Sequence, residues 1–475
     1  MNRRRFLKYA TATAGVVGAS ALGLDYLIRP QNVSLKQTTS NVTLTPPKIE
    51  GFQWQPTRIV NGKVYDATLS FTVKDMQSLA SVTGTIEDYA PTIPAAAYPA
   101  EPPRTLQLVS SQITGNGAGF STNVNNLKGG KQYKSRVKAM DSAGQQSSEE
   151  FKTPYVREFE NAAASDGILF SAPYLFFQSG GWGYWDPQNG TPLLGNYDSG
   201  DNLVAAKHID WATGFGISAL ALIWLGPSHY SSHMIRNLLA HPLIEDVKYF
   251  IFYDSLQLSG PQLRPGPWSV DDPAIRRNLL DGLDYLIQNN FLDQPSYLTV
   301  HGAHPIYFQG TLGWQGNIDT MMRELREKAR QSGIDLFIIG DSVEYYTPNL
   351  NRIKPFDAIT QFTNYSLTDP EINMHLEQDM DANYKVWTST AKTVGAHFIP
   401  SAIPGYRKPI WPDFLVTPRN LQRFKNQIEI GKKYLDPVLK MFLISTFNDW
   451  TENHQVEPSV EEGFGYLQAI RESAT

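Results

Sequence analysis

The chain has 475 residues, of which 41% are hydrophobic and 18% are charged. This length allows two or three domains, and the hydrophobic content excludes a globally disordered chain. The 41 Lys and Arg residues against 46 Asp and Glu residues give a net charge of −5, so we expect no nucleic-acid partner. The absence of cysteine excludes disulfides, thiolate nucleophiles and Cys-based metal centres.

Residues 1–29 have the composition of an export signal. Residues 2–8 read NRRRFLK, and residues 9–24 are uncharged and rich in Ala, Gly and Thr. This segment resembles a twin-arginine signal peptide with a small-residue cleavage site at Ala19-Ser20-Ala21. Its apolar stretch is shorter than the about 20 residues of a membrane span. We therefore expect a secreted or cell-surface/periplasmic protein without a stable membrane span once the signal is cleaved. The alternatives are an uncleaved N-terminal anchor and a chance basic start to a cytosolic protein.

Residues 30–46, rich in Ser, Thr, Asn and Pro, predict a linker. From residue 47 to 155 the pattern has period two, with apolar and polar residues alternating over 67–73 and 133–139. Turn sequences at Asn61-Gly62 and at 141–144 separate such runs. These features predict a small all-β sandwich. No acid pair recurs in it, so we expect an accessory domain without catalytic groups.

The run NLKGGKQYKSRVKAMDSAG, residues 126–144, resembles the end of a fibronectin type III-like (immunoglobulin/fibronectin-like) domain. In such domains a Leu six residues before a strand Tyr belongs to the tyrosine corner. The resemblance implies that Leu127 and Tyr133 take these places.

Residues 156–475 alternate between apolar runs and amphipathic stretches, which predicts repeated β/α units. The apolar runs are Ile168 to Phe177, Ile217 to Gly226, Val247 to Asp254, Pro305 to Gly310, Asp335 to Asp341, Ala358 to Asn364, His397 to Tyr406 and Met441 to Trp450. The helical stretches include Asp272 to Asn290, Asn317 to Ser332, Asp379 to Val394 and Thr417 to Lys433. Eight units over this length predict an α/β fold, a (β/α)8 TIM barrel. The alternative is a doubly wound sheet, although no Gly-rich phosphate motif follows the first strand.

The working residues of a (β/α)8 barrel lie at the C-terminal ends of its strands. There this sequence places carboxylates and amides among Trp and Tyr residues, which is typical of a site for a polysaccharide or glycan. The candidate sugar-binding residues are Tyr174, Trp224, Tyr253, Asp254, Asp341, Glu344, Tyr406, Asn448 and Trp450. The alternative is structural, because large folds carry many aromatic residues and strand-end acids often cap the next helix.

The segment FNDWTENHQVEP after the last apolar run carries Asp449 and Glu452 three residues apart, with Glu457 five residues further on. Glycoside cleavage needs two carboxyl groups, one protonated and one ionised. Two carboxyl groups held close together raise the pKa of one of them, which supplies the protonated form near neutral pH. Asp449 and Glu452 are therefore the candidate catalytic pair, with helix capping as the alternative role.

This segment resembles the NEWHE signature of glycoside hydrolase family 99, the endo-acting α-mannosidases and mannanases. Further segments agree in order over about residues 168–471. They are Gly195 to Asp201, Gly216-Ile217 with Trp224 to Pro227, Pro295 to Leu298, Pro404 to Tyr406 and Gln455 to Pro458. The resemblance adds Tyr197 and Asp198 to the candidate sugar-binding residues.

The resemblance implies a retaining endo-glycosidase acting on α-mannosidic or related linkages, without a cofactor. Glu452 then corresponds to the general acid and base, and Asp449 to the residue that helps the sugar 2-hydroxyl attack its own anomeric carbon. Asp449 stands where the family has Glu, and Thr451 stands where it has His. A shorter arm misplaces the base, and misplacement by about 1 Å costs about a hundredfold in rate.

Two other functions remain open from the sequence. One is a catalytically weak carbohydrate-binding or polysaccharide-assembly barrel. The other is a different polysaccharide hydrolase whose second carboxylate is Asp254, Asp341 or Glu344. We expect no metal site, because His229 and His233 lack the acid of an HExxH motif.

Overall fold

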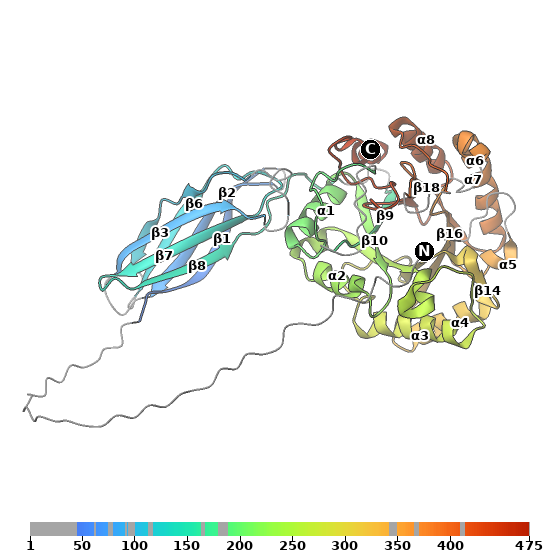
Figure 1. Cartoon of the computed structure of the whole chain (residues 1–475), viewed down its shortest axis with the longest axis horizontal. Coiled ribbons are helices and arrows are strands. Elements are labelled where there is room, and N and C mark those ends of the chain that lie inside the picture. The colour runs from blue at the N-terminus through green and yellow to red at the C-terminus, as the bar shows by residue number, and fades with distance from the viewer. Residues whose placement is uncertain are drawn as a thin grey trace, which may run out of the picture. The chain divides into compact units, whose positions relative to one another are not determined.

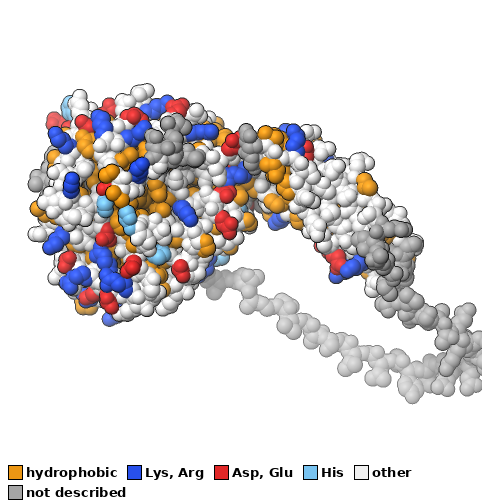
Figure 2. All heavy atoms as spheres, turned by 180° about the vertical axis from the view of Figure 1, so that it is seen from behind, with side chains coloured by type: hydrophobic (Ala, Val, Ile, Leu, Met, Phe, Trp, Pro, Cys, Tyr) orange, Lys and Arg blue, Asp and Glu red, His pale blue; other side chains and the backbone are white. Residues whose placement is uncertain are grey.

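The computed structural model describes residues 45–474 except 61–62, 75–78, 91–92, 94–99, 113–116, 163–166, 179–188, 342–348, 365–369 and 409–413 (Figure 1). The predicted signal peptide, nearly all of the predicted linker and the Asn61-Gly62 turn lie outside the described residues. Among the residues that the structure does describe, no helix has both the length and the apolar character that crossing a membrane requires. Figure 2 shows Lys and Arg side chains interspersed with Asp and Glu side chains over one face of the molecule.

The N-terminal part is a β-sandwich of two antiparallel sheets, with strand orders β1-β2-β6-β5 and β4-β3-β7-β8. The strands are β1 (Lys48–Val60), β2 (Lys63–Lys74), β3 (Leu79–Asp88), β4 (Arg104–Thr105), β5 (Val109–Gln112), β6 (Gly117–Val124), β7 (Tyr133–Asp141) and β8 (Gln146–Lys152). Leu69 of one sheet and Ile86 of the other share one buried cluster, so the sheets pack face to face. Leu127 and Tyr133 are buried in this cluster, and the Tyr133 hydroxyl accepts a hydrogen bond of 2.8 Å from the N–H of Lys128.

The second part is a parallel barrel, as the sequence predicts. Its strands are β9 (Leu169–Tyr174), β10 (Ile217–Trp224), β11 (Lys248–Asp254), β13 (His304–Gln309), β15 (Leu336–Asp341), β16 (Ala358–Thr360), β17 (His397–Ile399), β18 (Ser401–Ala402) and β19 (Met441–Ile444). Only Pro400 separates β17 from β18; β17 pairs with β16, and β18 pairs with β19. Together they act as the seventh strand, and β19 returns to β9 as the eighth. A further pair, β12 (Trp268–Ser269) and β14 (Trp314–Gln315), lies outside this sheet.

Helices surround the barrel (Figure 1). They are α1 (Asn202–Gly214), α2 (Tyr230–Leu239), α3 (Pro273–Gln288), α4 (Ile318–Arg330), α5 (Leu350–Ile353), α6 (Pro370–Met374), α7 (Leu376–Thr393), α8 (Leu421–Lys432) and α9 (Gly465–Ser473), with the 3₁₀ helices η2 (Pro242–Asp246), η3 (Ser255–Gln262) and η4 (Thr311–Gly313). The amphipathic pattern of α4 shows why they pack here, because Met321, Met322 and Leu325 are buried on one side.

The eighth strand is shorter than its apolar run. It ends at Ile444, whereas the run continues to Trp450. Beyond the strand, Asn448 and Asp449 use their side chains to accept hydrogen bonds from the backbone N–H groups of Leu175 and Thr451. Such bonds compete with strand pairing, so residues 445–457 form a loop. We call this segment the catalytic loop because it carries the candidate acid pair.

Candidate active site

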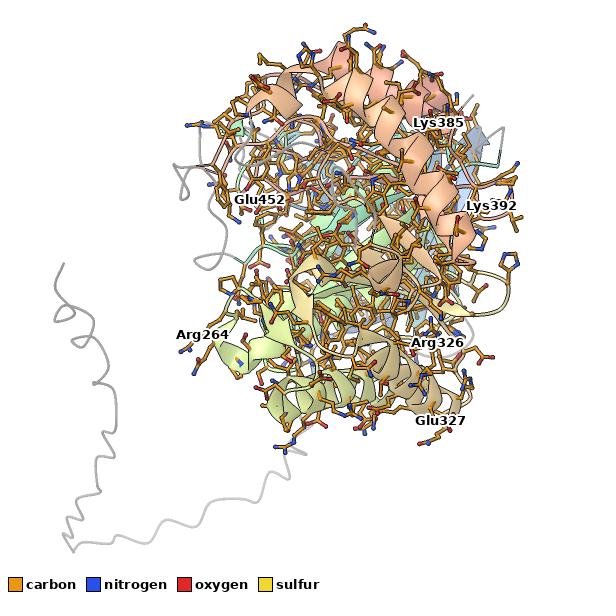
Figure 3. The ribbon with its side chains drawn as sticks, turned by 90° about the vertical axis from the view of Figure 1, so that its right-hand side faces the viewer. Arg264, Arg326, Glu327, Lys385, Lys392 and Glu452 are labelled. Carbon is orange, nitrogen blue, oxygen red and sulfur yellow. The ribbon has the colours of Figure 1, made fainter. Side chains whose placement is uncertain are left out.

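The catalytic loop lies at the C-terminal end of the barrel strands, which we call the barrel mouth. Figure 3 shows Glu452 on the opposite side of the barrel from Arg326, Glu327 and Lys392. Those three residues lie in the C-terminal halves of α4 and α7. Helices of a (β/α)8 barrel run antiparallel to the strands, so their C-terminal halves mark the opposite end of the barrel. Glu452 is therefore at the end where barrel enzymes carry their active sites.

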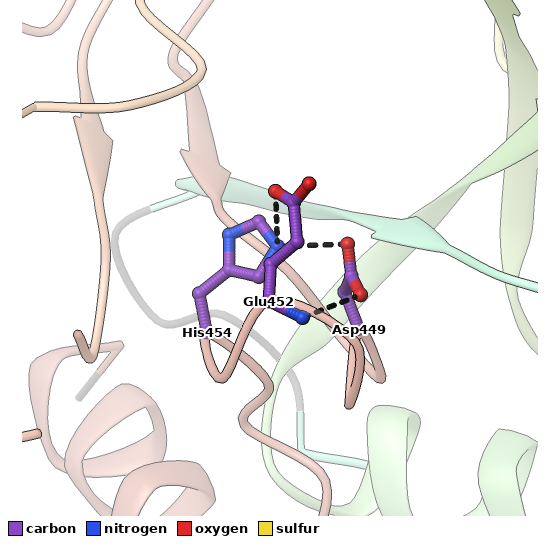
Figure 4. Close-up of side chains that lie close together, drawn as sticks. All are labelled: Asp449, Glu452 and His454. Carbon is purple, nitrogen blue, oxygen red and sulfur yellow. Dashed lines mark hydrogen bonds and ion pairs between the residues drawn. The ribbon is translucent and has the colours of Figure 1, made fainter. Parts of the chain in front are cut away.

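Asp449 is held by both of its carboxylate oxygens (Figure 4). Oδ1 accepts hydrogen bonds from the hydroxyl of Thr451, from its N–H at 3.0 Å and from the N–H of Glu452 at 3.2 Å. Oδ2 lies 2.9 Å from Nε2 of His454, which is fully buried. Burial alone would raise the pKa of Asp449, but the His454 imidazole and the Thr451 hydroxyl hold that pKa below its ordinary value. Asp449 is thus an ionised carboxylate, as a base must be.

Glu452 shares its surroundings with Asp449. Its Oε2 lies 3.6 Å from the same His454 nitrogen, and its Oε1 forms a salt bridge with Lys408. The N–H of Arg407 also donates to the Glu452 carbonyl at 2.9 Å, which ties the loop after β18 to the catalytic loop. The side chains of Glu452 and Lys408 are 17% and 15% exposed, and that of Asp449 is 9% exposed. Both carboxyl groups therefore retain limited contact with solvent.

Asp449, Glu452 and His454 each offer one ligand atom, and these atoms lie within 4.8 Å of one another. Carboxylate and imidazole are donor types that bind divalent cations such as Zn²⁺. The ammonium group of Lys408 already neutralises the Glu452 carboxylate, which disfavours a metal ion at the same oxygens. The arrangement fits proton transfer better than metal binding.

Glu457 is the centre of a buried hydrogen-bond network beneath the catalytic loop. Its Oε2 accepts from the Tyr197 hydroxyl at 2.8 Å and from Nε1 of Trp450 at 2.7 Å, and its Oε1 lies 3.0 Å from Nε2 of His208. The amide of Asn448 donates to the Tyr197 hydroxyl at 3.1 Å. Through this network, Tyr197, Asn448 and Trp450 stabilise the catalytic loop. Contact between these three residues and a sugar stays a prediction.

Tyr174, Trp224 and Tyr253 face the helices. Tyr174 pairs with Leu222 on β10, and Trp224 pairs with Tyr253, so all three lie on one face of the sheet. Their polar atoms reach the helix that follows each strand: the Tyr174 hydroxyl lies 2.8 Å from Nδ1 of His208 on α1, Trp224 Nε1 donates to Ser232 on α2 at 2.8 Å, and the Tyr253 hydroxyl donates to the Asn278 carbonyl on α3 at 3.4 Å. In this structure they anchor helices, because alternate residues of a strand point to opposite faces.

Asp254 and Asp341 are the last residues of strands β11 and β15. Their side chains point into the barrel, on the face of the sheet opposite to the aromatic residues that face the helices. Burial raises the pKa of Asp254 to about 6, and the nearby charge of Glu452 adds to this rise. Burial also raises the pKa of Asp341 to about 6. The charges of Glu452, Lys408 and Asp449 act on Asp254, so its carboxyl group lies within electrostatic reach of the acid pair at the barrel mouth. The sequence-predicted Glu344 lies outside the described residues.

Tyr406 and Asp198 are the remaining candidate sugar-binding residues that the structure describes. The ring of Tyr406 is 6.2 Å from that of His454, and burial together with the charges of Glu452 and Asp449 raises its pKa. Asp198 accepts a hydrogen bond of 2.7 Å from the N–H of Gly200 in its own turn. Tyr406 is therefore beside the acid pair, whereas this hydrogen bond of Asp198 orders its own turn.

Sequence reasoning missed His454 and Lys408 as partners of the acid pair. His454 lies in the same motif, two residues after Glu452. Because the family histidine is missing at position 451, the sequence could have suggested that a nearby histidine takes its place. Lys408 is 44 residues from Glu452 in the sequence, so only the fold brings the two together.

No protein-family model matches this sequence, and a search of curated proteins finds no match. Solved structures do match. A glycoside hydrolase-like protein covers 66% of this chain and 95% of its own length, at 17% identity and a TM-score of 0.53. The GH99 endo-alpha-mannosidase from Bacteroides thetaiotaomicron, in complex with bis-tris-propane, covers 64% of this chain and 95% of its own length, at 17% identity and a TM-score of 0.50. The second part of this chain therefore has the barrel fold of these two proteins.

Proposed function

We propose that this protein is a retaining glycoside hydrolase that cleaves α-mannosidic or related linkages within glycans. The observation that carries the proposal is the pair Asp449 and Glu452, whose carboxylate oxygens lie within 4.8 Å at the barrel mouth. Inverting glycosidases need carboxyl groups about 6.5–9.5 Å apart, to leave room for a water molecule. The short spacing favours retention.

In the first step, Asp449 takes the proton of the sugar 2-hydroxyl, whose oxygen attacks the anomeric carbon. Glu452 gives its proton to the departing glycosidic oxygen as that bond breaks, which leaves a 1,2-anhydro sugar. In the second step, Glu452 takes a proton from water and the water oxygen attacks the anomeric carbon. The bond between that carbon and the 2-oxygen breaks, and Asp449 returns its proton to the 2-oxygen. Two inversions at the anomeric carbon give net retention.

The salt bridge between Lys408 and Glu452 has a consequence for this cycle. A carboxylate paired with an ammonium group is ionised, whereas a general acid must carry a proton. Entry of the glycan must therefore separate Lys408 from Glu452, so that the carboxyl group takes up a proton before cleavage.

A second candidate is a catalytically weak carbohydrate-binding or polysaccharide-assembly barrel. It is favoured by the contacts of Asp449, because both carboxylate oxygens already accept hydrogen bonds from the loop or face His454. A base with no unoccupied acceptor transfers protons poorly.

The proposed setting is an exported protein in which residues 1–29 are a twin-arginine signal, 30–46 a linker, 47–155 a fibronectin type III-like accessory domain and 156–475 the hydrolase. The tyrosine-corner contact of Tyr133 supports the accessory domain assignment.

The proposed function is tested by incubating the purified protein with α-mannans and mixed glycans, followed by product analysis and NMR of the first-formed anomer. We expect internal cleavage with retained configuration, absent in Glu452→Gln. Tight glycan binding without turnover by the wild-type protein would favour the second candidate, and an inverted product would contradict the proposed mechanism.

A further inference from the structure

Three polar side chains share the wall of the barrel mouth that faces the catalytic loop. Asp254, Tyr307 and Asp341 come from β11, β13 and β15, which are neighbours in the barrel. The register pairs Phe252 with Tyr307 and Tyr307 with Ile339, so Tyr307 lies on the same inward face as both aspartates, which are two residues further along their strands. Tyr307 is therefore one inward-facing layer deeper than the two carboxyl groups.

The hydroxyl of Tyr307 is one of several buried polar atoms of the described residues that lack a hydrogen-bond partner, and it lies close enough to Asp254 and Asp341 to be affected by their charges. The residue is 1% exposed, and its hydroxyl oxygen has no hydrogen-bond partner among the described residues. A buried hydroxyl without a partner destabilises a fold, whereas Phe would fill the same space without that penalty. Packing of its ring against Phe252, at 4.6 Å and 83°, needs no hydroxyl. The hydroxyl group points to a ligand.

The two aspartates are fixed by the backbone, and neither forms an ion pair of 4.0 Å or less with a Lys, Arg or His among the described residues. Oδ1 of Asp254 accepts from the N–H of Leu256 at 2.9 Å. The carboxylate of Asp341 accepts from the N–H groups of Gly310 and Phe362, at 3.3 and 3.2 Å. These bonds orient the carboxyl groups without neutralising them, and burial raises both pKa values, although the charge of Lys408 offsets part of the rise at Asp254. Half-buried carboxyl groups with raised pKa values that face a barrel mouth are typical of ligand sites.

We propose that Asp254, Tyr307 and Asp341 form a subsite that binds the hydroxyl groups of an uncharged sugar ring opposite the acid pair. The inference rests on the proposed function, which puts a glycan at this mouth. Sugar hydroxyls donate to the carboxylates, and a ring seated on Tyr307 supplies the hydrogen-bond partner that its hydroxyl lacks.

The charges at the mouth define the substrate class. Three carboxyl groups, those of Asp254, Asp449 and Glu452, lie within electrostatic reach of the ammonium group of Lys408, and the carboxyl group of Asp341 ends strand β15 on the same inward face. An additional carboxylate or sulfate on the sugar would be repelled by this excess of negative charge. The subsite therefore selects neutral sugars over uronates and sulfated sugars.

The test is a calorimetric titration of the full chain carrying Glu452→Gln, which prevents turnover, with an α-linked mannobiose and an α-linked glucobiose at pH 7. We expect Asp254→Asn and Asp341→Asn in this background to weaken binding of the preferred disaccharide about tenfold or more, and Tyr307→Phe about three- to tenfold. The matched control is Tyr249→Phe on β11, whose buried hydroxyl donates to the Phe291 carbonyl at 2.8 Å. That variant should bind as tightly as its parent, and the corresponding uronic-acid disaccharides should not bind measurably.

Unchanged affinity in both aspartate variants would overturn the proposal, as would equal binding of the uronic-acid disaccharides or a lack of binding by both neutral disaccharides. The titration does not depend on turnover. Affinity that depends on Asp254 in a protein that hydrolyses no glycan would refute the proposed function and leave the subsite standing.

Discussion

The Nε2 atom of His454 lies 2.9 Å from Oδ2 of Asp449 (Figure 4). The same nitrogen is 3.6 Å from Glu452, so one buried imidazole contacts both members of the acid pair. The family motif that this segment resembles has its histidine at the position of Thr451. In this chain, His454 and Thr451 together hold the shorter Asp449 carboxylate in place.

We predict that removing this contact lowers turnover while the fold persists. His454→Ala deprives Asp449 of a charge-assisted hydrogen bond worth about 1.5–3 kcal/mol, so kcat should fall about 10- to 100-fold. His454→Gln retains an N–H donor and should recover part of the loss. Circular dichroism checks the fold, and equal kinetics for the two variants would contradict a role for the donated hydrogen bond.

The roles of the acid pair are separable by the leaving group. Glu452→Gln should reduce turnover of a natural glycan at least about a hundredfold, and should spare a substrate whose leaving group needs no proton. Asp449→Asn should slow both substrates alike, because the 2-hydroxyl attacks in each case. Steady-state kinetics on the two substrates decides between these patterns. Wild-type turnover in both variants would move the catalytic pair to Asp254, Asp341 or Glu344.

The stability of the protein should depend on pH through Asp254. Its folded pKa of about 6 exceeds the ordinary value of 3.8, so ionisation opposes folding and stability is lost as pH rises from about 4 through 6. Because the carboxyl group is partly exposed, Asp254→Asn should raise the free energy of unfolding at pH 7.5 by about 1–2 kcal/mol. Urea denaturation at pH 7.5 and pH 4 measures this gain, which should vanish at the lower pH.

Asp449→Asn provides the opposite case for the same experiment. Its pKa is held below the ordinary value, so the ionised form stabilises the fold at pH 7.5. The variant should be less stable than wild type there, and the difference should shrink as pH falls. A loss of stability in Asp254→Asn at pH 7.5 would contradict the raised pKa of that group.

The network around Glu457 should support the catalytic loop. Glu457→Leu leaves Tyr197, Trp450 and His208 without their shared acceptor and should reduce the free energy of unfolding by about 3–5 kcal/mol. The control is Glu472→Leu, which removes an exposed ion pair with Lys425. This variant should change the free energy of unfolding by less than about 1 kcal/mol. Thermal denaturation compares the two, and equal melting temperatures would exclude a structural role for the network.

Export is tested at the N-terminus. Replacing Arg3 and Arg4 together by Lys should retain the protein in the cytoplasm, because the twin arginine is the feature that the export machinery reads. Cell fractionation with immunodetection gives the result. Normal export of the double variant would refute the twin-arginine assignment, and a signal retained on the exported protein would indicate an N-terminal anchor.

Local sequence patterns determined the architecture. Each of the eight apolar runs coincides with a barrel strand, and the stretches from Asp272 and from Asn317 contain α3 and α4. The alternation over residues 67–73 likewise places Ala67, Leu69, Phe71 and Val73 in the sandwich core. These predictions succeed because hydrophobic periodicity is set by neighbours a few residues apart.

Tertiary structure decided which strand-end residues face the barrel mouth. Asp254 and Tyr253 are adjacent in the sequence, yet one lies within electrostatic reach of the acid pair and the other packs against α3, because consecutive strand residues point to opposite faces. Glu452 meets Lys408 only because β18 pairs with β19, which brings the loops that follow them together. The spacing of two carboxylates along the chain predicts that an acid pair exists. The residues that contact this pair depend on strand register and barrel closure, which cannot be predicted from a local sequence pattern.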